Sequence, residues 1–248
     1  MVESNNAIND TVGASITGVT NTLTVTNPSD TASSAARETI TVGGTSAGDP
    51  TINWNVVGTT DWEMGIDNGD SDKWKLSLGT ALGTDDTIVA YTTGEVLKPR
   101  NPGFFATINA SIPSVTGDDT AYTVIFNTET FDTGSNYDAT TGVFTAPVDG
   151  IYLFTYAINF SGINAAHNSF ISDLFINAIG LHGSGGNAFS QANTTGNLEA
   201  LGSFVVTLSA ADTVSVVGRV ANGAKVVSII ASSYPTFYQN SFSGYLVG

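Results

Sequence analysis

Large apolar residues alternate with polar residues through the stretch from about residue 37 to residue 93. Four short runs carry this alternation: Ile40 and Val42; Ile52, Trp54 and Val56; Trp62, Met64 and Ile66; and Trp74, Leu76 and Leu78. A period of two is typical of antiparallel strands with one apolar face. Clusters of Gly, Asn, Asp and Pro separate the runs, and such clusters favour turns. We therefore predict a β-meander, with a turn over residues 67–72 between strands that end at Ile66 and begin at Lys73.

The apolar face of this meander carries all three tryptophans of the chain, Trp54, Trp62 and Trp74. A single sheet of this size has nothing in its own chain to cover such a face. We predict that the tryptophans pack against the same sheet of two other copies, which we favour over stacking on sugars.

A second pattern fills residues 104–248, where strand-like runs alternate with turns at short intervals, as in a sandwich or jelly roll. Residues 151–160 are apolar on both faces, with Tyr152, Phe154, Tyr156, Ile158 and Phe160 on one face and Ile151, Leu153 and Ala157 on the other. Residues 170–179, 201–208 and 214–220 also mix apolar residues onto both faces. A two-layer sandwich covers only one face of each sheet, so we expect the second face to meet another subunit.

These patterns divide the chain into four parts. Residues 1–36 are rich in Thr, Ser and Asn and are expected to form an extended trimeric stalk. Residues 37–97 form a β-rich shaft module. Residues 98–103, with Pro99 and Pro102, form a linker, because proline breaks strand pairing. Residues 104–248 form the head. The predicted fold is all-β and antiparallel, and the predicted assembly is a homotrimer.

Composition excludes several kinds of partner. The chain carries a formal charge of −15 at pH 7, which repels phosphate backbones and anionic lipid headgroups. It has no cysteine, so disulfides and thiolate metal sites are excluded. No apolar run approaches the ~20 residues that span a bilayer. We therefore expect neither nucleic-acid binding nor membrane insertion.

The first residues lack the basic and apolar regions of a signal peptide. We expect either export without a signal, as for part of an assembled virion, or a fragment of a longer protein, and we favour the fragment.

Few residues carry candidate chemistry. His167 and His182 are predicted in exposed loops, without a partner at metal-ligand spacing. Asp67, Asp70 and Asp72 are weak candidates for calcium, because the glycine of their turn is misplaced for a calcium loop and no closing glutamate follows. Asp118 and Asp119 form a second acidic pair, interpreted as a solvated loop. We predict no enzymatic activity and no cofactor, with calcium as the one possible ion.

The head resembles the C1q and tumour necrosis factor superfamily over residues 102–248. An ordered series of motifs carries the resemblance: Phe104-Phe105-Ala106, Val124-Ile125-Phe126-Asn127 in a strand, Asn136-Tyr137-Asp138, Gly142-x-Phe144-x-Ala146-Pro147, Gly150-x-Tyr152-x-Phe154, Leu208 before Asp212-x-Val214, and Phe242-Ser243-Gly244-Tyr245-Leu246. The resemblance implies a trimeric jelly-roll head that binds rather than catalyses. Ala211 stands where the family has a glycine, and the collagen-like Gly-X-Y stalk is absent.

The preceding segment, residues 20–96, resembles modules in the shafts of phage tail fibres and bacterial fibre adhesins. The matching residues are 27–30, 48–50 and 65–74. This resemblance implies a phage or bacterial setting, with the protein extracellular, on a cell surface or at a virion fibre tip.

Recognition is expected in polar loops at residues 161–169, 183–197 and 231–240, since loops on a rigid scaffold usually carry specificity. The candidate ligand-binding residues are Tyr234, Phe237, Tyr238, His167, Asn168, His182, Asn187, Gln191 and Asn193. The aromatic residues of the last loop fit a ligand contact and a subunit contact equally well. The candidates for the trimer interface or core are Tyr152, Phe154, Tyr156, Phe160, Phe242, Tyr245, Trp54, Trp62 and Trp74.

The sequence therefore favours the receptor-binding tip of a trimeric fibre, an adhesin that recognises a cell-surface glycan or protein. A structural trimerisation and folding cap without a ligand of its own is the alternative. A polysaccharide depolymerase is the third and weakest hypothesis.

Overall fold

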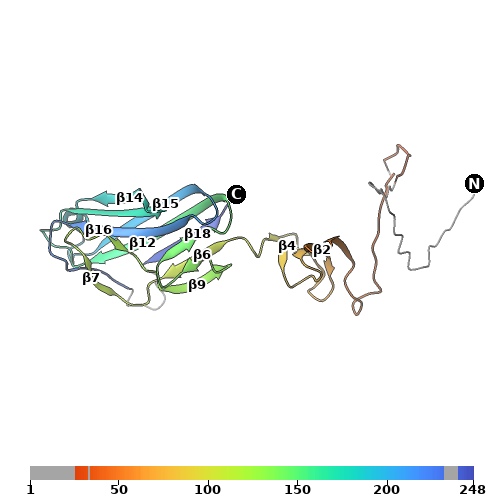
Figure 1. Ribbon diagram of the computed structural model, residues 1–248, viewed down its shortest axis with the longest axis horizontal. Coiled ribbons are helices and arrows are strands. Elements are labelled where there is room, and N and C mark those ends of the chain that lie inside the picture. Colours follow the sequence, from red (N-terminus) through yellow and green to blue (C-terminus); the bar gives the residue numbers. More distant parts are fainter. Residues whose placement is uncertain (1–25, 33, 232–239) are drawn as a thin grey trace, which may run out of the picture.

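The computed structural model of the protein describes residues 26–32, 34–231 and 240–248. Strands account for 50% of the described residues and helix for 2%, so the prediction of an all-β antiparallel fold is confirmed. A small sheet and a two-sheet sandwich follow one another along the longest axis of the molecule (Figure 1).

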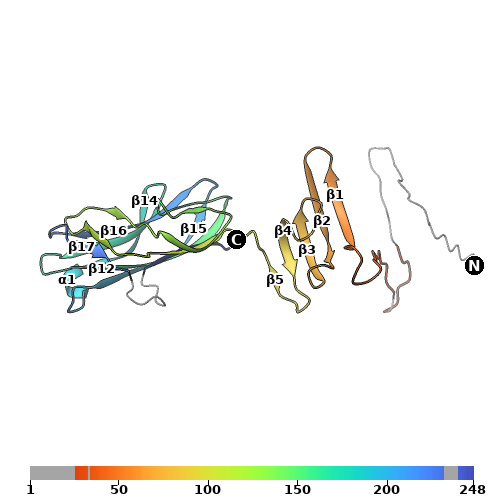
Figure 2. The ribbon, with the colours of Figure 1, turned by 90° about the horizontal axis from the view of Figure 1, so that it is seen from below.

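The small sheet is the shaft module. It consists of β1 (Thr51–Val56), β2 (Thr60–Asp67), β3 (Lys73–Leu78), β4 (Asp86–Ala90) and β5 (Val96–Leu97), paired in that order (Figure 2). The predicted turn at residues 67–72 is confirmed. The strand predicted at Ile40 and Val42 is wrong, since these residues are not in a strand. Pro50, which directly precedes β1, has no amide N–H to donate to a strand formed by these residues.

The head contains two antiparallel sheets. In the first, the order is β7 (Ile112–Thr116), β17 (Val227–Ile229), β12 (Gly150–Ser161), β18 (Ser241–Leu246), β6 (Gly103–Thr107) and β9 (Thr128–Thr133), and β15 (Leu198–Leu208) pairs with β12. In the second, the order is β10 (Tyr137–Asp138), β11 (Val143–Thr145), β16 (Thr213–Ala221), β13 (Ser169–Ile176) and β14 (Ile179–Gly186), and β8 (Tyr122–Thr123) pairs with β16. The one helix among the described residues is α1 (Ala188–Gln191).

Aromatic rings fill the space between the two sheets. The Phe104 ring lies 5.3 Å from that of Phe144 and 4.9 Å from that of Phe242, and Phe154 lies 5.9 Å from Phe242. The predicted inner face of residues 151–160 is confirmed, because its five aromatic and aliphatic side chains are all buried. Tyr152, Phe154, Tyr156, Phe160 and Phe242 thus belong to the core of one chain and leave no surface for a subunit interface.

Three local predictions in the head are wrong. Residues 170–179 were expected as one strand, but Asn177 and Ala178 adopt positive φ angles of 47° and 68° and form the two-residue turn between β13 and β14. Residues 124–127 are not in a strand, although Val124 and Phe126 are buried. The loop expected at residues 183–197 contains the end of β14 and helix α1.

The linker is tied to the last strand of the head. The Asn101 side-chain amide donates to the Leu246 carbonyl at 2.9 Å, and the Leu246 amide donates to the Pro102 carbonyl at 3.0 Å. These bonds fix which end of the head faces the shaft.

Candidate functional site

The outer face of the first head sheet carries exposed apolar side chains on either side of a polar row formed by Thr155, Ser203 and Ser243. Leu153 of β12 lies opposite Val205 of β15 on one side and Tyr245 of β18 on the other, and Ala157 lies opposite Leu201. Because side chains alternate along strands, these residues share one face. Val205 is 68% exposed, Leu201 55% and Tyr245 42%. Among the core and interface candidates, Tyr245 is the one in the head that lies on this surface.

The same face continues across β6 to β9. Phe105 lies opposite Phe131, and the Phe131 ring is 6.0 Å from that of Tyr245. Phe131 and Ile151 are both exposed. Exposed apolar side chains gathered on one face in this way make it a candidate interaction surface.

The shaft module leaves its apolar face only partly covered, while Lys75 on its other face is buried. The register places Trp54 opposite Trp62 and Ile66 opposite Trp74 on one face, and Trp54 is 48% exposed. The opposite face carries Lys75, which is only 3% exposed. The tryptophan face is therefore a candidate surface for contact with another copy of the chain.

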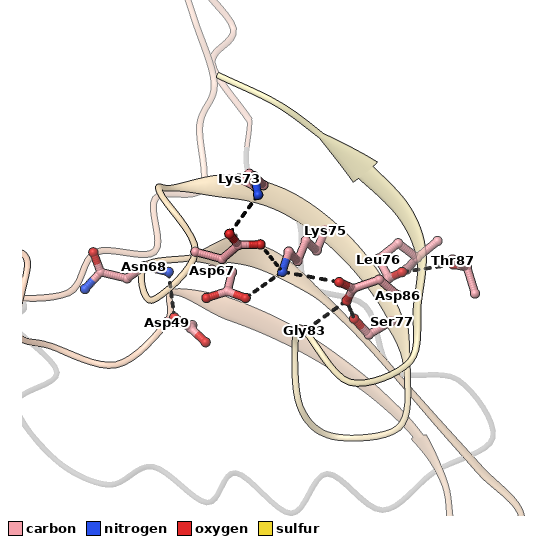
Figure 3. A network of polar contacts seen from close by, with 11 residues as sticks. Asp49, Asp67, Asn68, Lys73, Lys75, Leu76, Ser77, Gly83, Asp86 and Thr87 are labelled. Atoms are coloured by element: carbon pink, nitrogen blue, oxygen red, sulfur yellow. Dashed lines mark hydrogen bonds and ion pairs between the residues drawn. The ribbon is translucent and has the colours of Figure 1, made fainter. Parts of the chain in front are cut away.

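The acidic turn of the shaft contacts the side-chain ammonium group of Lys75. Lys75 Nζ lies 2.8 Å from an Asp67 oxygen, 2.7 Å from an Asp70 oxygen and 3.2 Å from an Asp86 oxygen (Figure 3). Asp70 also bonds Lys73 at 2.7 Å. The weak calcium hypothesis for Asp67, Asp70 and Asp72 is therefore wrong: Lys75 occupies the first two, and Asp72 is not among the carboxylates that bind Lys75. Among the described residues, no group of three or more His, Cys, Asp or Glu side chains is arranged to hold a metal.

This network shifts the pKa values of its members. Burial opposes the charged form of Lys75, but its hydrogen bonds to Asp67, Asp70 and Asp86 outweigh burial and raise its pKa. The hydrogen bond from Lys73, followed by that from Lys75, lowers the pKa of Asp70. Burial also opposes the charge on Asp86, yet hydrogen bonds from Ser77, Gly83 and Lys75 lower its pKa. These shifts keep Lys75, Asp70 and Asp86 charged at neutral pH.

Four loops lie at the end of the head away from the shaft. β12 begins beside the C-terminus, where the Ile151 amide donates to the Gly248 carbonyl, and ends at Ser161. The loops at residues 117–121, 162–168, 187–197 and 222–226 cluster at this far end, where α1 also lies (Figure 2). We call these four loops the tip.

Three predicted ligand-binding amides use their oxygen atoms within the tip itself. Asn187 Oδ1 accepts from the Ser190 amide at 3.0 Å as the N-cap of α1. Asn193 Oδ1 accepts from the amides of Thr195 and Asn197. Asn168 Oδ1 accepts from the side-chain amide of Asn222 at 2.6 Å. These residues shape the loops, while Gln191 lies beside Gly186.

Phe189 is an exposed aromatic residue that the sequence analysis missed. Its side chain is 52% exposed, while the neighbouring Ala188 is fully buried and anchors α1. The sequence signal was a lone aromatic residue between Ala188 and Ser190 in a polar stretch. Aromatic side chains on rigid supports are frequent anchors of binding surfaces, so Phe189 joins the candidates.

The two histidines occupy different settings from those predicted. The expectation of an exposed His167 is wrong, because its side chain is fully buried between tip loops. His182 is exposed, but it lies on β14 rather than in a loop, and its Nδ1 is 2.9 Å from an Asp173 oxygen. His167 therefore leaves the list of contact residues, and His182 lies at a sheet edge.

Tyr234, Phe237 and Tyr238 lie outside the described residues. Asn240, which follows that segment, is buried. Its side-chain oxygen accepts from the Asn159 amide at 2.6 Å, and its side-chain amide donates to the Ile230 carbonyl at 2.5 Å. Both ends of the segment at residues 231–240 are thus anchored to the first head sheet.

Comparison with known proteins identifies the head. A family model for the C1q domain matches residues 103–247. The globular domain of zebrafish complement 1qA protein shares 21% identity at a TM-score of 0.41, covering 59% of this chain and 98% of that one. Murine APRIL at pH 8.5 shares 13% identity at a TM-score of 0.40, covering 59% and 99%. Eiger TNF from S. frugiperda shares 12% at 0.40, covering 61% and 94%.

No curated protein matches the chain. Among the described residues, no helix has the length and apolar character needed to cross a membrane.

Proposed function

Because the chain belongs to the C1q domain family over residues 103–247, we propose that it forms the receptor-binding tip of a homotrimeric fibre. Domains of this family are typically trimeric, extracellular, and binding or structural rather than enzymatic. In this proposal the head recognises the receptor, the shaft module forms part of the fibre, and the assembly belongs to a phage or a bacterial surface.

The observation that carries the trimer is the pair of uncovered apolar faces. One lies on the head sheet around Leu153 and Val205, and the other lies on the shaft sheet around Trp54 and Trp62. Two further copies of the same chain supply apolar partners for both faces at once, and closed three-fold symmetry leaves neither exposed. Three identical tips then add avidity to individually weak contacts.

The tip supports recognition because it combines a rigid base with an exposed aromatic side chain. The loops stand on a sandwich whose core is fully buried, and Phe189 projects from α1 beside polar amides. An aromatic ring among amide groups suits a sugar ring or a protein surface. The proposed partner is therefore a cell-surface glycan or protein, with Phe189, Tyr234, Phe237 and Tyr238 as its contact residues.

A structural cap is the second candidate, and one observation favours it. The oxygen atoms of Asn168, Asn187 and Asn193 are already bonded within the tip, which lowers the number of free acceptors for a ligand. Under this hypothesis the head only nucleates the trimer of a longer fibre.

The deciding experiment is a glycan-array and whole-cell binding screen with the full chain. The variants are Phe189→Ala and the double variant Tyr234→Ala/Tyr238→Ala, with Val57→Ala as the control, since Val57 is an exposed apolar residue of the shaft. Binding that Phe189→Ala and the double variant each reduce about tenfold or more, and that Val57→Ala leaves unchanged, supports the proposal.

Other outcomes separate the alternatives. Binding by the wild type that neither Phe189→Ala nor the double variant changes removes both the tip and the segment at residues 231–240 as contact surfaces. No binding to any cell or glycan supports the structural cap, and release of sugar from a capsule supports a depolymerase.

A further inference from the structure

The His167 side chain lies in the middle of the tip. It is fully buried, and its ring lies between two glycines from different loops. A Cβ atom on Gly223 would lie 2.4 Å from the ring, and one on Gly117 would lie 3.0 Å from it. The ring therefore contacts two loop backbones and has no room to turn outward while the loops stay in place.

Both ring nitrogens are bonded, and the bonds define one tautomer. The Asn164 amide donates to Nδ1 at 3.0 Å, so Nδ1 carries no proton. Nε2 lies 3.1 Å from the Ala224 carbonyl oxygen, which can only accept, so Nε2 carries the proton. This arrangement requires the neutral imidazole.

The backbone of His167 links two further parts of the tip. Its amide donates to the Asn164 carbonyl at 2.9 Å, and its carbonyl accepts from the Phe189 amide at 2.9 Å. The same residue thus fixes the loop at 162–168, the loop at 222–226 and the helix that carries Phe189.

We infer that His167 is a pH-sensitive pin that holds the tip together only while its imidazole is neutral. A proton on Nδ1 would face the Asn164 N–H, so one hydrogen bond becomes a contact between two donors. It would also place a positive charge in a fully buried site. Protonation is accommodated only if the loops at 117–121, 162–168 and 222–226 separate and admit water.

The charged groups around the site do not offer a buried counter-ion. Asp118 and Asp119 follow Gly117, Lys225 follows Ala224, and Arg219 lies on the neighbouring strand. The Asp119 carboxylate bonds Arg219 at 3.0 Å, and the Asp118 carboxylate accepts from the Thr120 amide. Helix α1 and residues 162–168 contribute no acidic or basic side chain besides His167.

The inference rests on the proposed function only where it concerns binding: as the tip opens in acid, Phe189 loses its fixed support and attachment weakens. The opening itself is a property of the fold. A histidine side chain exposed to water has an ordinary pKa of about 6.5, and this value sets the range of pH over which the opening is tested.

Hydrogen exchange of the full chain tests the pin at about pH 7.5 and about pH 5.5, on either side of that range. Protection factors in the three loops are expected to fall about tenfold at the lower pH, the factor for loss of one buried hydrogen bond. The change is expected to persist in His182→Gln and to be absent in His167→Gln. Nitrogen NMR shifts of the wild-type imidazole report protonation without any variant.

The inference is overturned if the ring is protonated while the loops keep their protection, or if the pH response requires His182. Cell binding of the wild type at both pH values separates this inference from the proposed function. Opening in acid with unchanged binding refutes the tip as the contact surface and leaves the pin intact. Loss of binding without opening refutes the pin alone.

Discussion

At the scale of single residues, backbone conformation explains the departure of this chain from its family at Ala211. Ala211 has a φ angle of 72°, in the left-handed region that costs a non-glycine residue about 1–2 kcal/mol. The turn is held by the Ala211 amide bonded to the Ala146 carbonyl and by the Asp212 amide bonded to the Ser209 carbonyl. The strain is therefore retained by the surrounding bonds.

Ala211→Gly is expected to stabilise the head by about 1 kcal/mol, because glycine relieves the left-handed strain without removing a side-chain contact. Ala210→Gly is the control: Ala210 is the preceding residue of the same turn and does not have a positive φ, so glycine there gains nothing. Chemical denaturation followed by tyrosine circular dichroism measures both. Equal stability changes in the two variants would contradict the strain argument.

Lys75 is the residue on which the charged face of the shaft depends. Lys75→Met leaves three carboxylates close together without their shared cation, and we expect a loss of about 3 kcal/mol. Lys73→Met is the control, with an expected loss below about 1 kcal/mol, because Lys73 is more exposed and pairs with a single carboxylate, that of Asp70, besides its contact with the Tyr91 ring. All three tryptophans lie in the shaft, so tryptophan fluorescence reports its unfolding separately from that of the head. Similar losses in both variants would refute a central role for Lys75.

At the scale of elements, the period of two predicted the strands well wherever one face is buried. The buried face of β12 and the turn between β2 and β3 both followed from it. The β13–β14 hairpin was missed because its turn residues, Asn177 and Ala178, lack the glycine that usually marks a two-residue turn. The burial of His167 was missed because it depends on Gly117 and Gly223, which lie far away in the sequence.

The shaft sheet is expected to lose stability at both extremes of pH. The pKa values of Asp70 and Asp86 are lowered in the folded state, so their contribution is complete above the ordinary aspartate pKa of about 4 and is lost as the pH falls below it. The pKa of Lys75 is raised, so its contribution is complete below the ordinary lysine pKa of about 10.4 and is lost as the pH rises through the folded value.

The measurement is the unfolding midpoint of wild type and Lys75→Met, from tryptophan fluorescence over the accessible pH range. The difference between them should be largest near neutrality and should narrow below about pH 4, where the carboxylates take up protons in both proteins. A difference in unfolding midpoint that stays constant as the pH falls would show that the carboxylates do not account for the stabilising effect of Lys75.

At the scale of the whole molecule, the sandwich buries the aromatic residues between its two sheets and leaves apolar side chains of its outer face exposed, Phe131 and Tyr245 among them. The aromatic strand of the head is therefore a feature of the single chain, while Leu201, Val205 and Tyr245 are available to a partner. The sequence predicted that β12 would be apolar on both faces, and that one of these faces would not be covered by its own chain. The period of two does not tell which residues of β15 and β18 share that face. That information requires the strand pairing.

Light scattering of the full chain is expected to give three times the chain mass of 25.6 kDa. Val205→Asp should dissociate the assembly, because each of the three copies would bury an unpaired carboxylate in an apolar interface at a cost of several kcal/mol. Val226→Asp is the matched control, since Val226 is also exposed but lies in a tip loop away from this face.

Wild type that runs as a monomer, or Val205→Asp that stays trimeric, would refute the outer face of β12 and β15 as the contact between copies. Dissociation in both variants would instead indicate a general loss of solubility or folding. Loss of cell binding in Val205→Asp with an intact tip, measured by hydrogen exchange, would show that attachment depends on three tips acting together.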